Sequence, residues 1–545
     1  PGEWTYAVPT LNVPQENSPA DMETISQFPA LILFAQRAQA VRSNFTLDAS
    51  NIQAVTSICT ELDGLPLAIE LMAARMRLMT PQNLLEHWDR QFVLSADGMR
   101  AASPRQKNLN AAIAWSYNLL SNGEQKLFAH LSVFSGGFTL QDVETIFSGM
   151  FIEQSISALL TSLLDKSLLQ PAFNQEAREP VRFTMLVTIQ HFALSCLQSM
   201  GDEREARDKH LAYFLELAEE GKKEIQGPKQ AAWLHRLASA RDNLRSALDW
   251  AIESGQMEKA LKMASHLSWF WFRRSDLSEG RQWLGKVAGL PSASQYPGRY
   301  SYVLAQLAFH IWLQSGPKPA RPAVEQALSI ARANDDKWNI AWALIVLGLV
   351  LTHEGDLREA QSTIEKGKAL FGELRDKWGY ANATISLALG TYIQEELVTS
   401  LAQHQEALTA FRELGDIYFE SVALRFIGII QARQGNFASG IAALREALIL
   451  AQQVDSKYEI AAVLKQMCDP AQAQGNLVRA VHLCCASRNI FDSIGTWQQE
   501  DEAQFQDFLI TCRARLDESA FAEAVEQGRT MTTEQAIAYA LEDQE

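Results

Sequence analysis

Apolar residues recur along most of the chain at the three- and four-residue spacing of α-helices, and short polar segments separate these runs. Two of the runs meet at the stretch GLPLAIELMAARM, Gly64 to Met76. Glycine favours the left-handed position that ends a helix, and proline fits the first turn of the next one. The pattern predicts that one helix ends before Gly64 and another begins near Pro66. The two predicted apolar faces are Ile52, Val55, Cys59 and Leu62 before the corner, and Leu67, Leu71, Ala74 and Leu78 after it.

Further helical runs follow from about residue 101, with a Gly-Gly corner at Gly136 and Gly137. They lead to two short segments, Ser167 to Gln170 and Val181 to Met185, on either side of the ten-residue polar loop PAFNQEAREP. Short strand-like segments around a polar loop are typical of a β-hairpin. Helices that end in a hairpin predict a winged helix. From about Arg204 onward the pattern is helical, with no convincing strand.

The second half of the chain repeats with a period of 40 residues. Such a register predicts stacked α-hairpins, each of which covers the apolar face of its neighbour. At corners such as Gly355-Asp356, we expect glycine to turn the chain and the polar residue to cap the next helix. Glu395 stands where other units have glycine, so we expect that hairpin to be irregular. The recurring positions include Trp338, Trp378, Tyr418 and Tyr458; Asp336, Asp376 and Asp416; the small residues Gly348 and Gly428; and the corners Gly435-Asn436 and Gly475-Asn476.

Together these patterns predict a mainly α protein. We expect a helical domain plus a winged helix with one small β-hairpin, followed by a right-handed tetratricopeptide-like α-solenoid. Trp4, Tyr6 and Val8 indicate a strand remnant at the start. The predicted segments are a strand remnant and linker at 1–20, a helical domain with the GLPLA corner at 21–100, a winged helix at 101–203, degenerate repeats at 204–300, repeats of period 40 at 301–515, and C-terminal helices at 516–545.

Composition narrows the range of partners. The chain has 545 residues, 48 Lys and Arg against 64 Asp and Glu, and a net charge of −16. This balance argues against broad binding to nucleic acid or anionic membranes. The 6 cysteines form no CxxC motif and favour reduced thiols in the cytoplasm. The apolar stretch from Ile340 to Leu351 is too short to span a bilayer. Because the chain begins at Pro1 rather than Met, we expect a fragment or a processed product.

Five separated strings extend this interpretation. In their residues and in their order along the chain, they resemble the C-terminal two-thirds of a bacterial STAND signalling ATPase of the NB-ARC/LuxR-type large ATP-binding regulators. The resemblance covers nearly the whole chain. The strings are CTELDGLPLAIELMAARMRLMTPQNLL (Cys59 to Leu85), PRQKNLNAAIAWSYNLLSNGEQKLFAHLSVFSGGFTL (Pro104 to Leu140), RFTMLVTIQHFAL (Arg182 to Leu194), RDNLRSALDWA (Arg241 to Ala251) and FAEAVEQGRTMTTEQAIAYAL (Phe521 to Leu541).

The resemblance implies that the corner of Gly64, Leu65 and Pro66 contacts adenine in an intact parent protein that binds ADP or ATP with magnesium. A packed helix junction is the alternative. The chain has no GxxxxGK[ST] phosphate loop, so the nucleotide-binding α/β core is expected outside it. We therefore expect no cofactor in this chain and no enzymatic activity. At Met185-Leu186-Val187, where relatives carry polar residues, the apolar side chains favour a buried stripe over phosphate sensing.

Three other groups of residues are weighed for chemistry. A winged helix can place a helix in the DNA major groove, but residues 101–200 hold six Lys or Arg against seven Asp or Glu, so we expect no direct nucleic-acid contact. His482, Cys484 and Cys485 are too few for a zinc site and indicate core packing. The aromatic run SWFWFRR, Ser268 to Arg274, either packs between hairpins or binds a ligand.

The favoured function is the regulatory and sensor arm of a STAND-type signal-transduction regulator whose repeats bind a protein or small-molecule inducer. One alternative is a non-catalytic tetratricopeptide scaffold for protein–protein interaction. Another is the regulatory half of an enzyme whose effector domain lies upstream. The expected partners are the inducer and the missing upstream nucleotide-binding domain, with no membrane. Oligomerisation on activation stays open.

Overall fold

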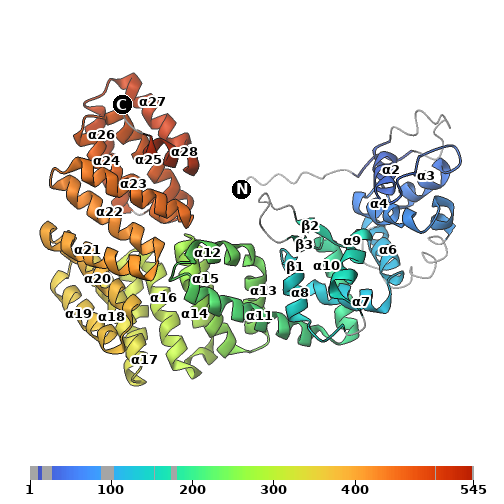
Figure 1. Ribbon diagram of the computed structural model, residues 1–545, viewed down its shortest axis with the longest axis horizontal. Coiled ribbons are helices and arrows are strands. Elements are labelled where there is room, and N and C mark those ends of the chain that lie inside the picture. The colour runs from blue at the N-terminus through green and yellow to red at the C-terminus, as the bar shows by residue number, and fades with distance from the viewer. Residues whose placement is uncertain are drawn as a thin grey trace. The chain divides into compact units, whose positions relative to one another are not determined.

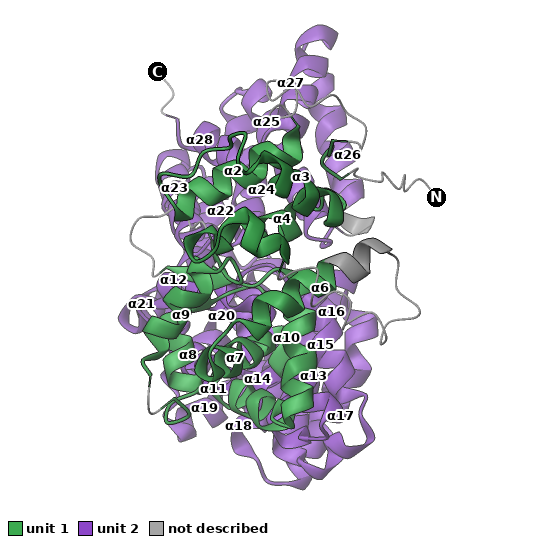
Figure 2. Cartoon of the chain, turned by 90° about the vertical axis from the view of Figure 1, so that its right-hand side faces the viewer, with its two compact units in different colours: residues 1–213, 245–247 green, residues 214–244, 248–545 purple. Residues whose placement is uncertain are grey.

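The computed structural model of the protein describes residues 10–14, 28–86, 104–151, 154–172, 181–497 and 499–542. The predicted strand remnant at Trp4, Tyr6 and Val8 lies outside these residues. The chain divides into two compact units (Figure 2). Unit 1 comprises residues 1–213 and 245–247, and unit 2 comprises residues 214–244 and 248–545.

Unit 1 begins with a small helical domain. Its helices are α2 (Pro29–Val41), α3 (Ile52–Glu61), α4 (Pro66–Ala73) and the 3-10 turn η1 (Ala74–Arg77). The predicted stop and restart around Gly64 is confirmed, because α3 ends at Glu61 and Pro66 opens α4. The core of this domain includes Leu31, Phe34, Val55, Cys59, Ile69 and Met72, and Trp115 from the following helix closes it.

The rest of unit 1 has winged-helix architecture, as predicted. Its sheet has the order β1-β3-β2, with both pairs antiparallel, and Phe183 lies opposite Phe138 on one side and Pro171 on the other. The expected hairpin is β2 with β3, and β1 adds a third strand. The elements are α6 (Pro104–Asn118), α7 (Asn122–His130), η2 (Leu131–Val133), β1 (Phe138–Thr139), α8 (Leu140–Ile146), α9 (Ile156–Asp165), β2 (Gln170–Ala172), β3 (Arg182–Thr184), α10 (Val187–Met200) and α11 (Glu203–Glu224), which continues into unit 2.

In its described part, unit 2 consists of helices and one 3-10 turn (Figure 1). Consecutive helices pair as α-hairpins and form the expected tetratricopeptide-like solenoid. They are α12 (Gln230–Ser239), α13 (Arg241–Glu253), α14 (Met257–Arg273), α15 (Leu277–Ala288), η3 (Pro291–Gln295), α16 (Pro297–Ser315), α17 (Pro317–Ala333), α18 (Lys337–Glu354), α19 (Leu357–Leu374), α20 (Lys377–Ile393), α21 (Leu397–Leu414), α22 (Ile417–Arg433), α23 (Phe437–Gln453), α24 (Lys457–Ala473), α25 (Leu477–Ser493), α26 (Gln499–Arg513), α27 (Glu518–Thr530) and α28 (Thr533–Leu541).

Backbone geometry accounts for the 40-residue period. A residue with positive φ ends a helix at every twentieth position from Asp335 to Gly495. Helices of 17 or 18 residues and short corners fill the intervals. Two helices and two corners therefore make one repeat. The left-handed positions are Asp335, Gly355, Arg375, Glu395, Gly415, Gly435, Asp455, Gly475 and Gly495.

Side-chain bonds join successive repeats at the same register. The indole of Trp338 donates to Asp376, 38 residues later, at 2.7 Å, and the indole of Trp378 donates to Asp416 at 2.9 Å across the same interval. Each acceptor also caps its own helix, since Asp376 accepts from the backbone N–H of Gly379 at 2.8 Å. The recurrence of Trp and Asp in the sequence thus marks one contact from repeat to repeat.

Glycines inside the helices let the two helices of a hairpin approach closely. A Cβ on Gly348 would lie 2.2 Å from Ile364, and a Cβ on Gly428 would lie 2.8 Å from the carbonyl oxygen of Gly440. The small residues that recur at these positions therefore allow the close approach of the two helices.

Two predictions about the corners are wrong. Glu395 does not make its hairpin irregular, because α20 ends at Ile393 and α21 begins at Leu397, as in the neighbouring units. Glu395 adopts φ +62° instead. Asp356 at the glycine corner makes no side-chain capping bond to its helix. The caps come from Asp336, Asp376 and Asp416, at the corners between repeats.

Among the described residues, no helix combines the length and apolarity needed to cross a bilayer.

Candidate functional site

The corner predicted to contact adenine lies on the surface of the helical domain. Gly64 is buried at φ +64°, Leu65 is half-buried and Pro66 is exposed. The N–H of Leu11 donates to the carbonyl of Gly64 at 3.0 Å. A Cβ at position 64 would lie 2.0 Å from the Leu11 carbonyl oxygen, so this approach requires glycine. The three residues thus form one tight, partly apolar surface, and their contact with adenine stays a prediction.

Unit 2 carries a second candidate site on its inner face, which we define as the face formed by the first helix of each hairpin, α14 to α24. An aromatic cluster on this face centres on Trp269 of α14. The ring of Trp269 lies 5.3 Å from that of Trp342 and 4.9 Å from that of Trp378, centroid to centroid, and Phe309 lies at 5.8 Å. Edge-on contacts of this kind each add about 0.5–1.5 kcal/mol beyond the burial of area. The run SWFWFRR therefore packs between hairpins, as one of its two interpretations predicts, and the other interpretation, binding of a ligand, stays a prediction.

A buried ion pair holds this cluster together. Nη2 of Arg273, at the end of α14, donates to Oδ2 of Asp416 at 2.5 Å, and both side chains are fully buried. Asp416 also accepts from Trp378 at 2.9 Å and from Gln230 at 2.7 Å. Burial lowers the pKa of Arg273, and Asp416 opposes that effect. Among the described residues, Nε and Nη1 of Arg273 have no hydrogen-bond partner, although the guanidinium lies 5.3 Å from the Trp269 ring.

A cavity of about 240 Å³ opens beside the cluster. Its lining includes a second buried ion pair, in which Arg425 bonds both carboxylate oxygens of Glu459, at 2.7 and 3.3 Å. Burial raises the pKa of Glu459, and Arg425 opposes that rise. The other lining groups used below are Trp269, Phe272, Phe309, Trp342, His353, Asn382, Ser386 and Phe426. We call this cavity with its lining the inner cleft.

A wider polar space adjoins the inner cleft. It measures about 860 Å³ and shares Trp312, Leu313, His353 and Tyr458 with the cleft. Its charged lining residues include Arg321 and Glu354, which form an ion pair of 2.5 Å. We call the wider space the polar vestibule and the smaller one the apolar chamber. A mainly apolar lining with a few polar groups is typical of small-molecule sites.

Sequence reasoning found part of this site. It singled out the aromatic run and the position of Asp416, but neither the partner of Asp416 nor the pair of Arg425 with Glu459. A signal for the second pair exists, because Arg425 and Glu459 are 34 residues apart and the surface pair of Arg412 with Glu446 repeats that spacing. No such recurrence marks Arg273 and Asp416, which are 143 residues apart.

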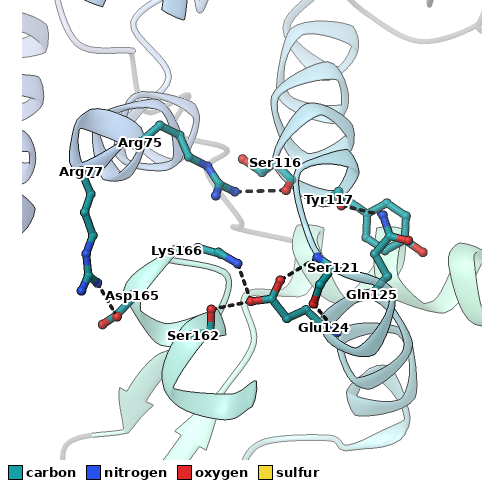
Figure 3. A network of polar contacts seen from close by, with 10 residues as sticks. All are labelled: Arg75, Arg77, Ser116, Tyr117, Ser121, Glu124, Gln125, Ser162, Asp165 and Lys166. Carbon is teal, nitrogen blue, oxygen red and sulfur yellow. Dashed lines mark hydrogen bonds and ion pairs between the residues drawn. The ribbon is translucent and has the colours of Figure 1, made fainter. Parts of the chain in front are cut away.

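The winged helix contains a polar network that ties α9, the helix before the hairpin, to its neighbours (Figure 3). Glu124 accepts from Lys166 and Ser162, and from the backbone N–H of Ser121 at 2.7 Å. Burial alone would raise the pKa of Glu124, yet these three donors lower it to about 2. Asp165, at the end of α9, pairs with Arg77 of the helical domain at 2.6 Å. The network therefore contacts α9 on two sides, through bonds to buried Glu124 and through an exposed ion pair to Arg77.

The helix α9 itself presents few groups for a nucleic acid. In a helix-turn-helix, the second helix enters the major groove. The sequence of α9, ISALLTSLLD, contains no Lys or Arg. Its exposed residues are Ser157, Ala158, Thr161 and Asp165.

Two smaller predictions can also be compared with the structure. The expected buried stripe at Met185-Leu186-Val187 is wrong, because the first two residues are half-buried and Val187 is 64% exposed at the start of α10. His482, Cys484 and Cys485 are buried, and Nδ1 of His482 lies 2.8 Å from the Tyr539 hydroxyl. Within the described residues, no group of three or more His, Cys, Asp or Glu side chains has a metal-binding arrangement.

Comparison with known families identifies one part of the chain. Residues 120–198 match the family of the winged helix-turn-helix domain. A curated relative in Mycobacterium bovis, "Putative HTH-type transcriptional regulator Mb0914c", is 34% identical over 357 residues, which cover 64% of this chain and 38% of the relative. An uncharacterized Mycobacterium tuberculosis protein is 32% identical over 203 residues, covering 37% of this chain and 48% of that protein. The chain thus spans less than half the length of these curated relatives.

Two solved structures are similar to this chain at low identity. One is a STAND protein with a tetratricopeptide repeat sensor from Pyrococcus horikoshii, with 15% identity and a TM-score of 0.49, covering 95% of this chain and 72% of that chain. The other is a Rap protein complexed with competence and sporulation factor, with 14% identity and a TM-score of 0.38, covering 76% of this chain and 99% of that chain.

Proposed function

We propose that the chain is the regulatory and sensor arm of a STAND-type signal-transduction regulator of transcription, and that an inducer binds its repeats at the inner cleft. The observation that carries the proposal is the apolar chamber of about 240 Å³ beside two buried ion pairs, with a polar vestibule. The winged helix-turn-helix match and a relative named as a transcriptional regulator support the output side. The inducer shifts the protein only if it binds the active arrangement more tightly than the resting one.

The nucleotide switch is proposed for a domain outside this chain. The tight backbone of Gly64 and the exposed ring of Pro66 support a contact with a flat base. A nucleotide also needs a phosphate cradle, and the sequence contains no phosphate loop. In the proposed mechanism this chain contributes the base contact and the sensor, while ADP or ATP with magnesium belongs to the longer protein. The chain alone is not an enzyme in this proposal.

The experiment is denaturation of the purified longer protein and identification of the released small molecules. Stoichiometric ADP supports the switch. If no ADP is released and the repeats still capture a partner, the result contradicts the switch and favours the scaffold alternative. A catalytic module in the longer protein whose activity follows nucleotide state would favour the enzyme alternative instead.

Direct DNA contact is a second candidate function. The match of residues 120–198 to a winged helix-turn-helix domain counts against the expectation of no direct nucleic-acid contact. The acidic balance of the chain and the lack of Lys and Arg in α9 count for that expectation. Fluorescence anisotropy of a labelled random-sequence duplex separates the two. Micromolar binding that weakens steeply with salt supports DNA contact, whereas no binding at low salt contradicts it.

A further inference from the structure

We infer that the inner cleft binds a small, neutral, largely apolar molecule that presents a hydrogen-bond acceptor, such as the carbonyl of an aromatic ketone or ester. The inference rests on the proposed sensor function and specifies the class of its ligand.

The size and lining of the chamber set the first limits. Its volume of about 240 Å³ lies just below the range of about 300–1,000 Å³ that is usual for small-molecule sites. Rings of Trp269, Phe272, Phe309 and Trp342 form much of the wall. Aromatic walls favour flat apolar ligands, which they contact by stacking or edge-on. One or two fused rings match this chamber.

Charge pairing in the protein makes the site neutral. The guanidinium of Arg425 is matched by Glu459, and the guanidinium of Arg273 behind the aromatic wall is matched by Asp416. His353 also lines the chamber, and burial lowers its pKa, so its ring is uncharged near neutral pH. A charged ligand would lose its hydration without gaining an unpaired counter-charge, which is costly in an apolar chamber.

The two members of the Arg425 pair differ in what they present to the chamber. The Glu459 side chain is fully buried, whereas the Arg425 side chain keeps 11% of its surface exposed. Two guanidinium nitrogens of Arg425, Nε and Nη2, bond Glu459. A guanidinium carries five N–H donors and no acceptor, so the N–H groups of Arg425 that Glu459 does not take are donors, and the same guanidinium lies 4.5 Å from the centroid of the Phe426 ring. The pair therefore offers the ligand a hydrogen-bond donor without a net charge.

Three other polar groups of the lining bond within their own helices, and one of them, Nδ1–H of neutral His353, donates to the carbonyl of Leu349 at 3.0 Å, which leaves Nε2 of His353 as an acceptor. The amide nitrogen of Asn382 donates to the carbonyl of Trp378 at 3.1 Å, and the hydroxyl of Ser386 donates to the carbonyl of Asn382 at 2.8 Å. Among the described lining residues, the buried polar atom without a partner is Nε1 of Trp342, a second donor. A ligand with an acceptor complements these donors.

The test uses prodan, a neutral fluorescent naphthyl ketone with one carbonyl, and the whole chain. We expect saturable binding at a 1:1 ratio, with an emission maximum far to the blue of that in water. Two matched ligands define the class. The same dimethylaminonaphthalene without its propionyl carbonyl should bind about tenfold more weakly, since one hydrogen bond is lost. The anionic dye anilinonaphthalene sulfonate should bind more weakly still.

Variants then locate the site. The double substitution Arg425→Met with Glu459→Met removes the donor together with its counter-charge, so no buried charge is left unpaired. We expect prodan to bind this variant about tenfold more weakly and to emit further to the blue, because its carbonyl loses a hydrogen bond. The control is Arg412→Met with Glu446→Met, an exposed pair with the same 34-residue spacing, which should change neither reading. Ser386→Met, which fills the chamber, should abolish binding, with unfolding temperature and circular dichroism as checks on folding.

The outcomes are distinguishable. Three results would each overturn the inferred ligand class. They are equal affinity for prodan and its carbonyl-free analogue, tighter binding of the anionic dye than of prodan, and unchanged prodan affinity and emission in the folded Arg425/Glu459 variant. Binding that follows the inference but leaves amide exchange in unit 1 of the longer protein unchanged would support the ligand class and contradict the sensor function.

Discussion

At the scale of single residues, Glu395 shows how the repeat tolerates a poor local choice. Its φ of +62° lies in the left-handed region, which costs an L-residue roughly 1–2 kcal/mol. The helices on both sides have 17 and 18 residues, within the range of 17 or 18 residues that their counterparts at Gly355 and Gly435 have. Packing between the two helices therefore holds the backbone of this corner in the left-handed region, and Glu395 adopts that conformation despite its cost.

Replacing Glu395 by glycine should stabilise unit 2. Glycine adopts positive φ without a steric penalty, but it loses more backbone entropy on folding, so we expect a net gain of about 0.5–1 kcal/mol. Amide exchange of α20 and α21 measures the change. The control is Gly355→Ala, at φ +90° with open space around it, which should lose about 1 kcal/mol. A Glu395→Gly variant no more stable than the parent would contradict the account.

Glu124 gives a pH dependence. Its pKa in the folded protein is about 2, below its ordinary value of 4.5, so the network of Figure 3 stabilises the fold above about pH 4.5 and loses that contribution as the pH falls toward 2. Glu124→Gln should therefore lower the stability of α7 and α9 by about 2 kcal/mol at pH 7, and by much less near pH 2. Hydrogen exchange of these helices measures both values. Glu144→Gln, an exposed site on α8, should show little effect at either pH.

At the scale of elements, three aspartates occupy the same position in successive repeats but make different numbers of bonds. Asp336 caps its helix through Asn339. Asp376 caps its helix and also accepts from the Trp338 indole. Asp416 caps its helix, accepts from the Trp378 indole and from Gln230, and pairs with buried Arg273. The series separates a cap from a buried ion pair within one structural context.

Substitution of each aspartate by alanine should follow that order. We expect losses of about 1 kcal/mol at Asp336, about 2 kcal/mol at Asp376 and about 3–5 kcal/mol at Asp416, where a buried guanidinium is left unpaired. Denaturant unfolding of unit 2, followed by tryptophan fluorescence, measures the series. Equal losses at the three positions would show that the ion pair adds nothing beyond the cap.

These elements also show what a sequence can and cannot predict. The stop at Gly64, the hairpin β2-β3 and the period of 40 were predictable, because glycine, proline and apolar spacing act on the local chain. The caps were assigned to the wrong corners, since Asp356 and Asp336 follow left-handed residues alike and only the fold distinguishes them. The inner cleft was not predictable as a cavity, because its wall combines side chains from α14 to α24.

At the scale of a whole unit, unit 2 differs from an open array. In an open array each repeat contacts only its neighbours, and stability is close to a sum of local terms. Here Arg273 bonds Asp416 across 143 residues, Ser275 bonds the backbone of Tyr458 across 183, and Arg274 pairs with Asp455 at 2.6 Å. The end of α14 is thus joined to the starts of α22 and α24.

We call these contacts between the end of α14 and the starts of α22 and α24 the closure of unit 2. The closure predicts that the helices it joins unfold together. In the chain without substitutions, the slowest amides of α14 and α22 should exchange through one common opening, with the same free energy of opening and the same denaturant dependence. In Asp416→Ala, the two helices should exchange with separate free energies. Hydrogen exchange with mass spectrometry at several denaturant concentrations resolves the difference. Separate openings in the chain without substitutions would contradict coupling through these contacts.

The closure also constrains how this chain can gain or lose length over evolution. A block of 40 residues is the natural unit of duplication, because it returns the chain to the same left-handed position. However, adding or deleting one block between Arg273 and Asp416 would place a different corner opposite the end of α14. Arg273 would then lose its ion-pair partner, Asp416. Among the described residues beyond Tyr458, no hydrogen bond or ion pair to α14 fixes the number of repeats. Homologous chains should therefore vary in repeat number at the C-terminal end and keep it constant between α14 and α24.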